Sequence, residues 1–244
     1  MKRILYAAST VLLLMQSPCH AGFLEDLSRE VQTKVQPQKS LDNSTIVKGL
    51  KEALASGTER AVTVVAMPDG YFGNQSIKIL LPDKIQQAAD ILGKIGYQQQ
   101  VDEFVLSMNR AAEKAAPKAA AVFGDAIRKM TVEDAKGILS GGDTAATSFF
   151  EKKTRLQLFE AFKPMVAKSM DQVGTARSYK EMIGKYESVP FMSLAGIPSL
   201  DLNTYVTNKA LDGLFVMVGD EEKKIRTNPA ARTTDLLRKV FGSK

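Results

Sequence analysis

The chain has 244 residues and a net charge of +6, with 25% charged and 44% hydrophobic residues. Cys19 is its only Cys, His20 is its only His, and it contains no Trp. Basic and acidic residues are interspersed, with no basic run between aromatics, and this excludes the usual pattern of a nucleic-acid binder.

The first 21 residues have the order of a secretory signal peptide. Lys2 and Arg3 give a positive start, and residues 4–15 form an uncharged, largely apolar stretch. That stretch is too short for a membrane span, which needs roughly 20 residues. We therefore expect cleavage after Ala21, a periplasmic protein and no transmembrane anchor.

A lipid attached to Cys19 is the alternative for this N-terminal segment. A lipoprotein signal has an aliphatic residue three before the Cys and a small one directly before it, where this chain has Gln16 and Pro18. Cleavage after Ala21 would leave a mature chain with neither thiol nor imidazole. Such a chain lacks the groups for Ser-His-Asp or Cys-His catalysis and for His- or Cys-based metal sites. We expect no metal, no cofactor and no disulfide.

After the signal peptide, we expect an N-terminal arm at residues 22–43 and one helical domain at 44–242. A first helix, with Ser44 as N-cap, ends at Pro68-Asp69-Gly70. Residues 77–81 are the one stretch that suits a short extended segment. A helix after Pro82 then reaches Gly96.

The middle of the chain continues with helical spacing. A long helix starts near Gln98 and meets Pro117, which must kink it or begin another helix. Thr131 and Asp134 form the pattern of a capping box for a short helix that follows.

The remaining elements complete an all-α fold. Asp143 or Thr144 caps a longer helix that runs to Gly174, and another helix follows it. Residues 187–200 form a Pro-punctuated apolar loop, and Asp201 caps the next helix. A last helix places a set of apolar residues on one side: Leu236, Leu237, Val240 and Phe241. We predict a packed bundle of about seven to nine helices.

The segment 108–117 carries the first candidate binding residues. Arg110 lies three residues before Glu113 and four before Lys114, so the three polar groups emerge near one side of a helix. They could line a cleft and hold an anionic ligand. The alternative is an intrahelical ion pair with caps to neighbouring helices.

The turn at residues 69–74 carries the other candidates. Tyr71 and Phe72 stand between glycines, where two aromatics can form a mobile lid or a contact surface for a ligand. Alternatively, they plug the end of the bundle.

Four segments contain composite motifs, in this order: Gly-Tyr-Phe-Gly-Asn at 70–74, Met-Asn-Arg-Ala-Ala-Glu-Lys-Ala-Ala-Pro at 108–117, Lys-Ala-Leu-Asp-Gly-Leu-Phe at 209–215 and Asn-Pro-Ala-Ala-Arg-Thr at 228–233. Together they resemble the bacterial family known as domain of unknown function 4197, over residues 44–242. The resemblance implies an exported helical protein and brings no reaction, ligand or catalytic residue with it.

We favour a non-enzymatic periplasmic module that binds a partner protein of the envelope or an apolar, acidic ligand such as a fatty acid or phospholipid. One alternative is a carboxylate-dependent hydrolase of the cell envelope, with Glu59, Glu113 and Asp212 as candidate acids. Another is a structural envelope protein without a ligand. The sequence leaves the oligomeric state open.

Overall fold

The computed structural model describes residues 43–190, 201–232 and 234–241, except for the side chains of residues 84, 236, 237 and 239. The predicted signal peptide, nearly all of the predicted arm and most of the apolar loop 187–200 lie outside the described residues.

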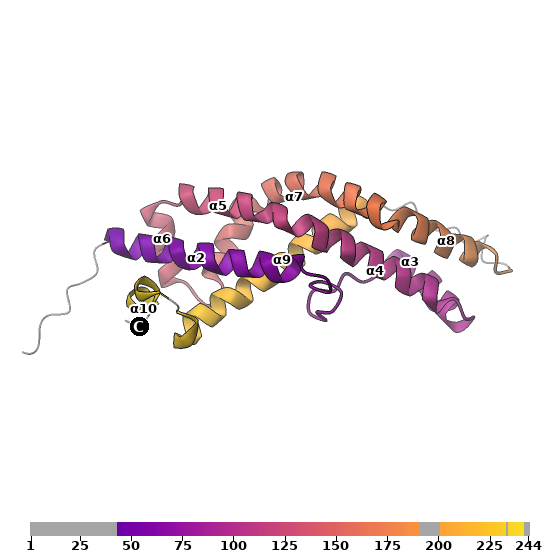
Figure 1. The fold of residues 1–244 in the computed structure, drawn as a ribbon, viewed down its shortest axis with the longest axis horizontal. Coiled ribbons are helices and arrows are strands. Elements are labelled where there is room, and N and C mark those ends of the chain that lie inside the picture. Colours follow the sequence, from indigo (N-terminus) through magenta and orange to yellow (C-terminus); the bar gives the residue numbers. More distant parts are fainter. Residues whose placement is uncertain (1–42, 191–200, 233, 242–244) are drawn as a thin grey trace, which may run out of the picture. The chain divides into compact units, whose positions relative to one another are not determined.

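The described residues form helices and no strand, which confirms the all-α class (Figure 1). The α-helices are α2 (Asn43–Ala66), α3 (Asp83–Lys94), α4 (Gln98–Ala115), α5 (Ala119–Lys129), α6 (Val132–Ser140), α7 (Ala145–Val173), α8 (Thr175–Glu187), α9 (Leu202–Thr227) and α10 (Asp235–Phe241). Two short 3-10 helices, η1 (Ala116–Lys118) and η3 (Pro229–Ala231), join α4 to α5 and follow α9. No helix in this part of the chain is both long and apolar enough to cross a lipid bilayer.

Most helix ends are where local sequence signals predict them. Thr131 and Asp134 form the expected capping box at the start of α6. The side chain of Asp201 accepts the N–H of Thr204 at 3.0 Å and caps α9. Pro117 lies in η1, so it begins a new helical segment after α4.

The start of α7 differs from the prediction. Thr144 is its N-cap residue, but the Thr144 side chain makes no capping hydrogen bond. The carboxylate of Glu222 in α9 accepts the N–H groups of Ala146 and Thr147 instead, at 2.9 and 2.8 Å. The cap therefore comes from another helix, which local sequence signals do not reveal.

Helix α9 packs against both α2 and α7 in the core. Arg60 on α2 pairs with Glu221 on α9 at 2.8 Å, and Arg155 on α7 pairs with Asp212 on α9. Aromatic rings of Phe123, Phe150 and Phe215 then meet edge to face where α5, α7 and α9 adjoin, with centroids 5.5 and 6.1 Å from Phe123.

The predicted extended segment at 77–81 is not a strand. Ile77, Ile79 and Leu81 are buried while Leu80 is 60% exposed, which is the alternation of a strand. The described residues contain no partner strand. The side-chain amide of Asn109 on α4 takes its place: it accepts the N–H of Ile79 and donates to the Ile79 carbonyl, both at 2.8 Å.

Candidate functional site

The buried carboxylate of Glu113 holds the turn that follows α2. Its Oε1 accepts the backbone N–H groups of Tyr71 at 3.1 Å and Phe72 at 3.2 Å. Its Oε2 accepts a hydrogen bond from Arg110 Nη1 at 2.7 Å. Since Glu113 is only 4% exposed, these partners replace the water that its charge would otherwise require.

Arg110 extends the same network to the surface. Its Nη2 donates to Asp69 Oδ1 at 2.7 Å, so one guanidinium bridges two carboxylates. The hydrogen bond to Glu113, together with the one to Asp69, raises the pKa of Arg110 although partial burial opposes this. Asp69 has φ of 65°, an uncommon conformation for a residue with a side chain, and the bond to Arg110 helps to hold it.

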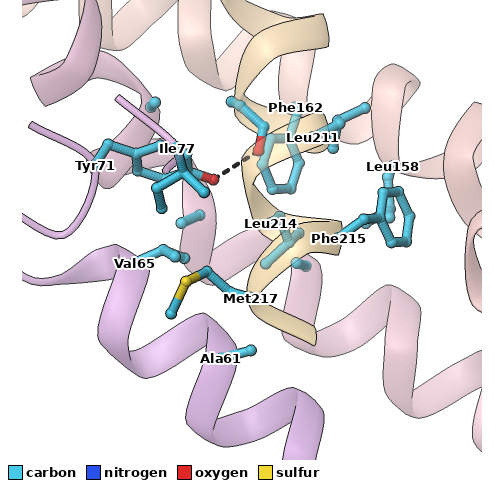
Figure 2. Packing of buried hydrophobic residues seen from close by; sticks show 14 of the residues in the cluster. Ala61, Val65, Tyr71, Ile77, Leu158, Phe162, Leu211, Leu214, Phe215 and Met217 are labelled. Atoms are coloured by element: carbon cyan, nitrogen blue, oxygen red, sulfur yellow. Dashed lines mark hydrogen bonds between the residues drawn. The ribbon is translucent and has the colours of Figure 1, made fainter. Parts of the chain in front are cut away.

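Tyr71 fastens the turn to α9. Its side chain is fully buried, and its hydroxyl donates to the carbonyl of Ala210 at 2.7 Å (Figure 2). Burial, and then the charge of Glu113, raise the pKa of Tyr71 far above its usual range, so the hydroxyl remains a donor. A Cβ atom on Gly213 would lie 2.8 Å from the Tyr71 ring, so only glycine permits this approach.

The structure thus brings together four of the five predicted site residues. Phe72 is half-buried, and Lys78 Nζ lies 4.0 Å from the centre of its ring. Lys114 is exposed and takes no part in the hydrogen bonds that join Arg110, Glu113, Tyr71 and Phe72. The polar groups of the cluster bond one another, as the ion-pair alternative expects. A ligand at this cluster stays a prediction.

The three acids named for a hydrolase lie in different surroundings. Glu59 is exposed on α2, and Glu113 is buried in the turn network. Asp212 is exposed and bonded by Arg155 of α7. In the part of the chain that the structure describes, no group of three or more His, Cys, Asp and Glu gathers as a metal ion would require.

A small cavity lies elsewhere, between α2, α7, α9 and α10. Only about 20 Å³ of it is free, room for about one water molecule. Its walls are mainly apolar, and Glu222 and Arg226 are the charged residues among them. The lining residues are Leu50, Ala53, Leu54, Gly57, Thr58, Ala146, Phe150, Val218, Glu222, Ile225, Arg226 and Phe241. We call this space the α10 cavity.

Glu222 and Arg226 form a buried ion pair in the wall of the α10 cavity, with side chains 7% and 10% exposed. Arg226 Nε donates to Glu222 at 2.9 Å, and its Nη2 donates to the carbonyl of Ile138 at 2.8 Å. Thr147 Oγ1 also donates to Glu222, at 2.8 Å. The i, i+4 spacing of the two residues is typical of such a pair, but their bonds to α6 and α7 join residues far apart in the sequence and have no local signal.

Helix α10 contributes Phe241 to the wall of the α10 cavity. Val240 and Phe241 are 7% and 8% exposed, and α10 packs on α2. The ring centre of Phe241 lies 5.9 Å from the Arg226 guanidinium carbon. The sequence predicted that α10 has an apolar side, and the buried Val240 and Phe241 confirm this for the side chains described.

Arg232 secures the chain between α9 and α10. Its guanidinium donates to the carbonyls of Ile225 at 3.0 Å and Arg226 at 2.8 Å, which are acceptors at the end of α9. Asn228 caps η3 by accepting the N–H of Ala230 at 3.0 Å. The motif at 228–233 therefore ends α9 and directs the chain toward α10.

A family model described as "Protein of unknown function (DUF4197)" matches residues 40–242. The chain belongs to the DUF4197 family. This confirms the resemblance seen in the four motif segments. No curated protein and no solved structure matches the chain.

In this DUF4197 protein, three of the four motif segments meet at one junction. The turn 70–74 contacts Glu113 from the segment 108–117, and Tyr71 bonds Ala210 and packs on Gly213 from the segment 209–215. The residues that carry the family resemblance thus include those that hold the turn between α4 and α9. The residues that line the α10 cavity all lie outside the four motif segments.

Proposed function

We propose that this DUF4197 protein is a non-enzymatic binding module of the bacterial periplasm. It takes up the acyl chain of an apolar acid, a free fatty acid or a phospholipid, in the α10 cavity. The observation that carries the proposal is the construction of this cavity: apolar walls from long helices, one guanidinium in the wall, and a seven-residue terminal helix as the cover.

The free space in the cavity is too small for an acyl chain, so uptake requires a wall of the cavity to move, and we propose that this wall is α10. Moving it would expose Val240 and Phe241, at about 1.5–3 kcal/mol for each side chain. Each methylene that an acyl chain buries contributes about 0.8 kcal/mol. About four to eight buried methylenes therefore offset the exposure of these two side chains, and a long acyl chain has more than that.

Arg226 is the residue that we propose binds the acidic headgroup. A guanidinium binds carboxylate and phosphate through paired N–H donors, and Arg226 is the cation in the wall of the α10 cavity. The Phe241 ring lies over this guanidinium, whose Nε and Nη2 are bonded to Glu222 and to the Ile138 carbonyl. An anionic headgroup would take over donors of Arg226 from Glu222 while its chain lies between α2 and α9.

The periplasmic location rests on the order of residues 1–21, which fits a cleaved signal peptide. Cell fractionation followed by N-terminal sequencing tests it. We expect a periplasmic protein that begins at Gly22. An uncleaved chain in the cytoplasm would contradict this location.

Native mass spectrometry tests the binding proposal. The protein is purified from the periplasm without detergent, and any additional mass is extracted with organic solvent. A fatty acid and a phospholipid differ in the extract, so the experiment identifies the source of the acyl chain. Delipidated protein is then titrated with oleate and with oleyl alcohol. We expect tighter binding of oleate, and equal binding of the two would contradict the role of Arg226.

A further inference from the structure

We propose that a second hollow in this protein binds a free α-amino acid with an apolar side chain. The hollow lies between α5, the start of α6 and α7, and offers about 260 Å³ of space. We call it the α6 hollow. It shares no lining residue with the α10 cavity, so this inference is independent of the function proposed above. Its size suits a small molecule, because sites for drug-sized ligands measure about 300–1,000 Å³.

Four charged side chains line the α6 hollow, and two of them are already paired. Asp125 on α5 accepts hydrogen bonds from Arg128 and, at 3.4 Å, from Lys129. The other two are Asp134, in the first turn of α6, and Lys153 on α7. Among the described residues, these two form no ion pair with each other or with any other side chain. Their charges therefore remain available to a ligand.

Asp134 and Lys153 present opposite charges to the same space. Asp134 Oδ2 accepts the N–H of Thr131 at 3.0 Å, a capping bond that brings no positive charge. The hydrogen bonds with Thr131 lower the pKa of Asp134, desolvation opposes this, and the charge of Lys153 lowers it further. Lys153 Nζ lies 5.7 Å from the centre of the Phe149 ring.

A zwitterion complements this pair of charges better than an ion of one sign does. A ligand with only a negative charge would be repelled by Asp134, and one with only a positive charge would be repelled by Lys153. In an α-amino acid, the ammonium and the carboxylate are attached to one carbon. The ammonium can therefore bind Asp134 while the carboxylate binds Lys153.

The apolar part of the α6 hollow can receive the side chain of the amino acid. Ala126, Met130 and Phe149 form this part of the wall. The Phe149 ring is half-buried and packs edge to face on Phe150, with ring centres 5.8 Å apart, so its neighbour holds its orientation. Met130 has an unbranched side chain that adapts to the shape of what it contacts. An amino acid such as leucine would bury its side chain here.

A titration followed by NMR chemical shifts tests the α6 hollow in the whole protein. The probes are leucine, leucine amide, which lacks the carboxylate, and N-acetylleucine, which lacks the ammonium. Lys153→Gln removes the partner proposed for the carboxylate. Lys152→Gln is the matched control, because Lys152 is the exposed neighbour on α7 and does not line the hollow. Both substitutions are at exposed positions, so both variants should fold.

We expect leucine to shift the resonances of residues in the α6 hollow with a dissociation constant of about 1 mM or lower. Each of the two derivatives should bind at least about tenfold more weakly. Lys153→Gln should weaken leucine binding at least about fivefold, and Lys152→Gln should leave it unchanged. Absence of saturable shifts at the hollow would overturn the proposal, and so would equal effects of the two substitutions.

Reversal of one charge gives a second, independent measurement. In Lys153→Glu, both unpaired groups of the hollow are negative, so the cationic leucine amide should bind more tightly than leucine does. A preference that stays with leucine would contradict the pairing of the ligand carboxylate with Lys153. Neither result depends on whether the α10 cavity binds oleate.

Discussion

The carboxylate of Glu113 accepts the backbone N–H of Tyr71, 42 residues earlier in the chain, at 3.1 Å. The same oxygen accepts the N–H of Phe72, while Arg110 bonds the other oxygen. Helix α4 thereby supplies the acceptor for a turn whose N–H groups would otherwise be buried without a partner. The pair explains why a charged residue stands in the Ala-rich part of α4.

Replacing Glu113 with Gln should lower the free energy of unfolding by about 1–3 kcal/mol. The amide keeps one acceptor but presents an N–H donor to Arg110 or to the turn, so a hydrogen bond is lost either way. Urea denaturation measures the change. Lys114→Gln is the control, because Lys114 is exposed, and we expect a change within about 0.5 kcal/mol. Equal effects of the two substitutions would contradict the role of Glu113.

Replacing Gly213 with Ala should destabilise the protein by about 1–3 kcal/mol. The added Cβ would lie 2.8 Å from Tyr71 Cε1 and 3.0 Å from Ile77 Cβ, and neither atom belongs to a flexible chain end. Gly219→Ala in the same helix is the matched control. Its Cβ meets Thr147 Oγ1 at 3.6 Å, an ordinary contact, so helix propensity should make it neutral or stabilising. The difference in unfolding midpoint between the two variants measures the packing of Tyr71 on α9.

The free energy of unfolding should decrease at acidic pH, because Glu221 then becomes protonated. Burial opposes ionisation, but hydrogen bonds from Lys224 and Arg60 lower the pKa of Glu221 below its usual value. Because the pKa of Glu221 is lower in the folded state, its ionisation stabilises the fold at pH values above the pKa of the unfolded state, about 4.3. This contribution disappears as the pH falls through the pKa of the folded state. Thermal unfolding of wild type and Glu221→Gln, measured from neutral to acidic pH, should converge at low pH. Curves that remain parallel would contradict this role, and exposed Asp220→Asn is the control.

Replacing Arg110 with Ala tests whether the hydrogen bonds around Glu113 stabilise the fold without taking part in ligand binding. Glu113 and Asp69 lose a partner, so the variant should be less stable than wild type. Oleate affinity should stay unchanged under conditions where the variant is folded, because Arg110 does not line the α10 cavity. Calorimetric titration measures it. A large loss of affinity in the folded variant would place the ligand at Arg110.

The sequence predicts the features of this fold that depend on neighbours along the chain. Helical spacing identifies α2 and α4, and the side-chain patterns at Thr131 and Asp201 identify caps that close within three residues. Long-range partners were not predictable in the same way. Glu222 caps α7 from 76 residues away and Asn109 pairs with Ile79 across 30 residues, so only folding brings these groups together.

The same distinction applies to the candidate site. The spacing of Arg110 and Glu113 indicated an interaction between them, and the structure confirms it. The bonds of Glu113 to the turn depend on how α2 and α4 pack. The α10 cavity depends on four helices, and its residues resemble ordinary core positions in the sequence. Only the three-dimensional structure shows that Arg226 lines this cavity.

The most direct measurement of the central claim is the oleate affinity of Ala53→Leu compared with Ala55→Leu. Both residues belong to α2, but Ala53 lines the α10 cavity and is 2% exposed, whereas Ala55 is exposed. Circular dichroism first establishes that both variants fold, since overpacking at Ala53 costs about 1–3 kcal/mol. We predict that Ala53→Leu fills the cavity and weakens oleate binding, while Ala55→Leu binds as wild type does. Equal affinity of both variants for oleate would contradict the α10 cavity as the binding site.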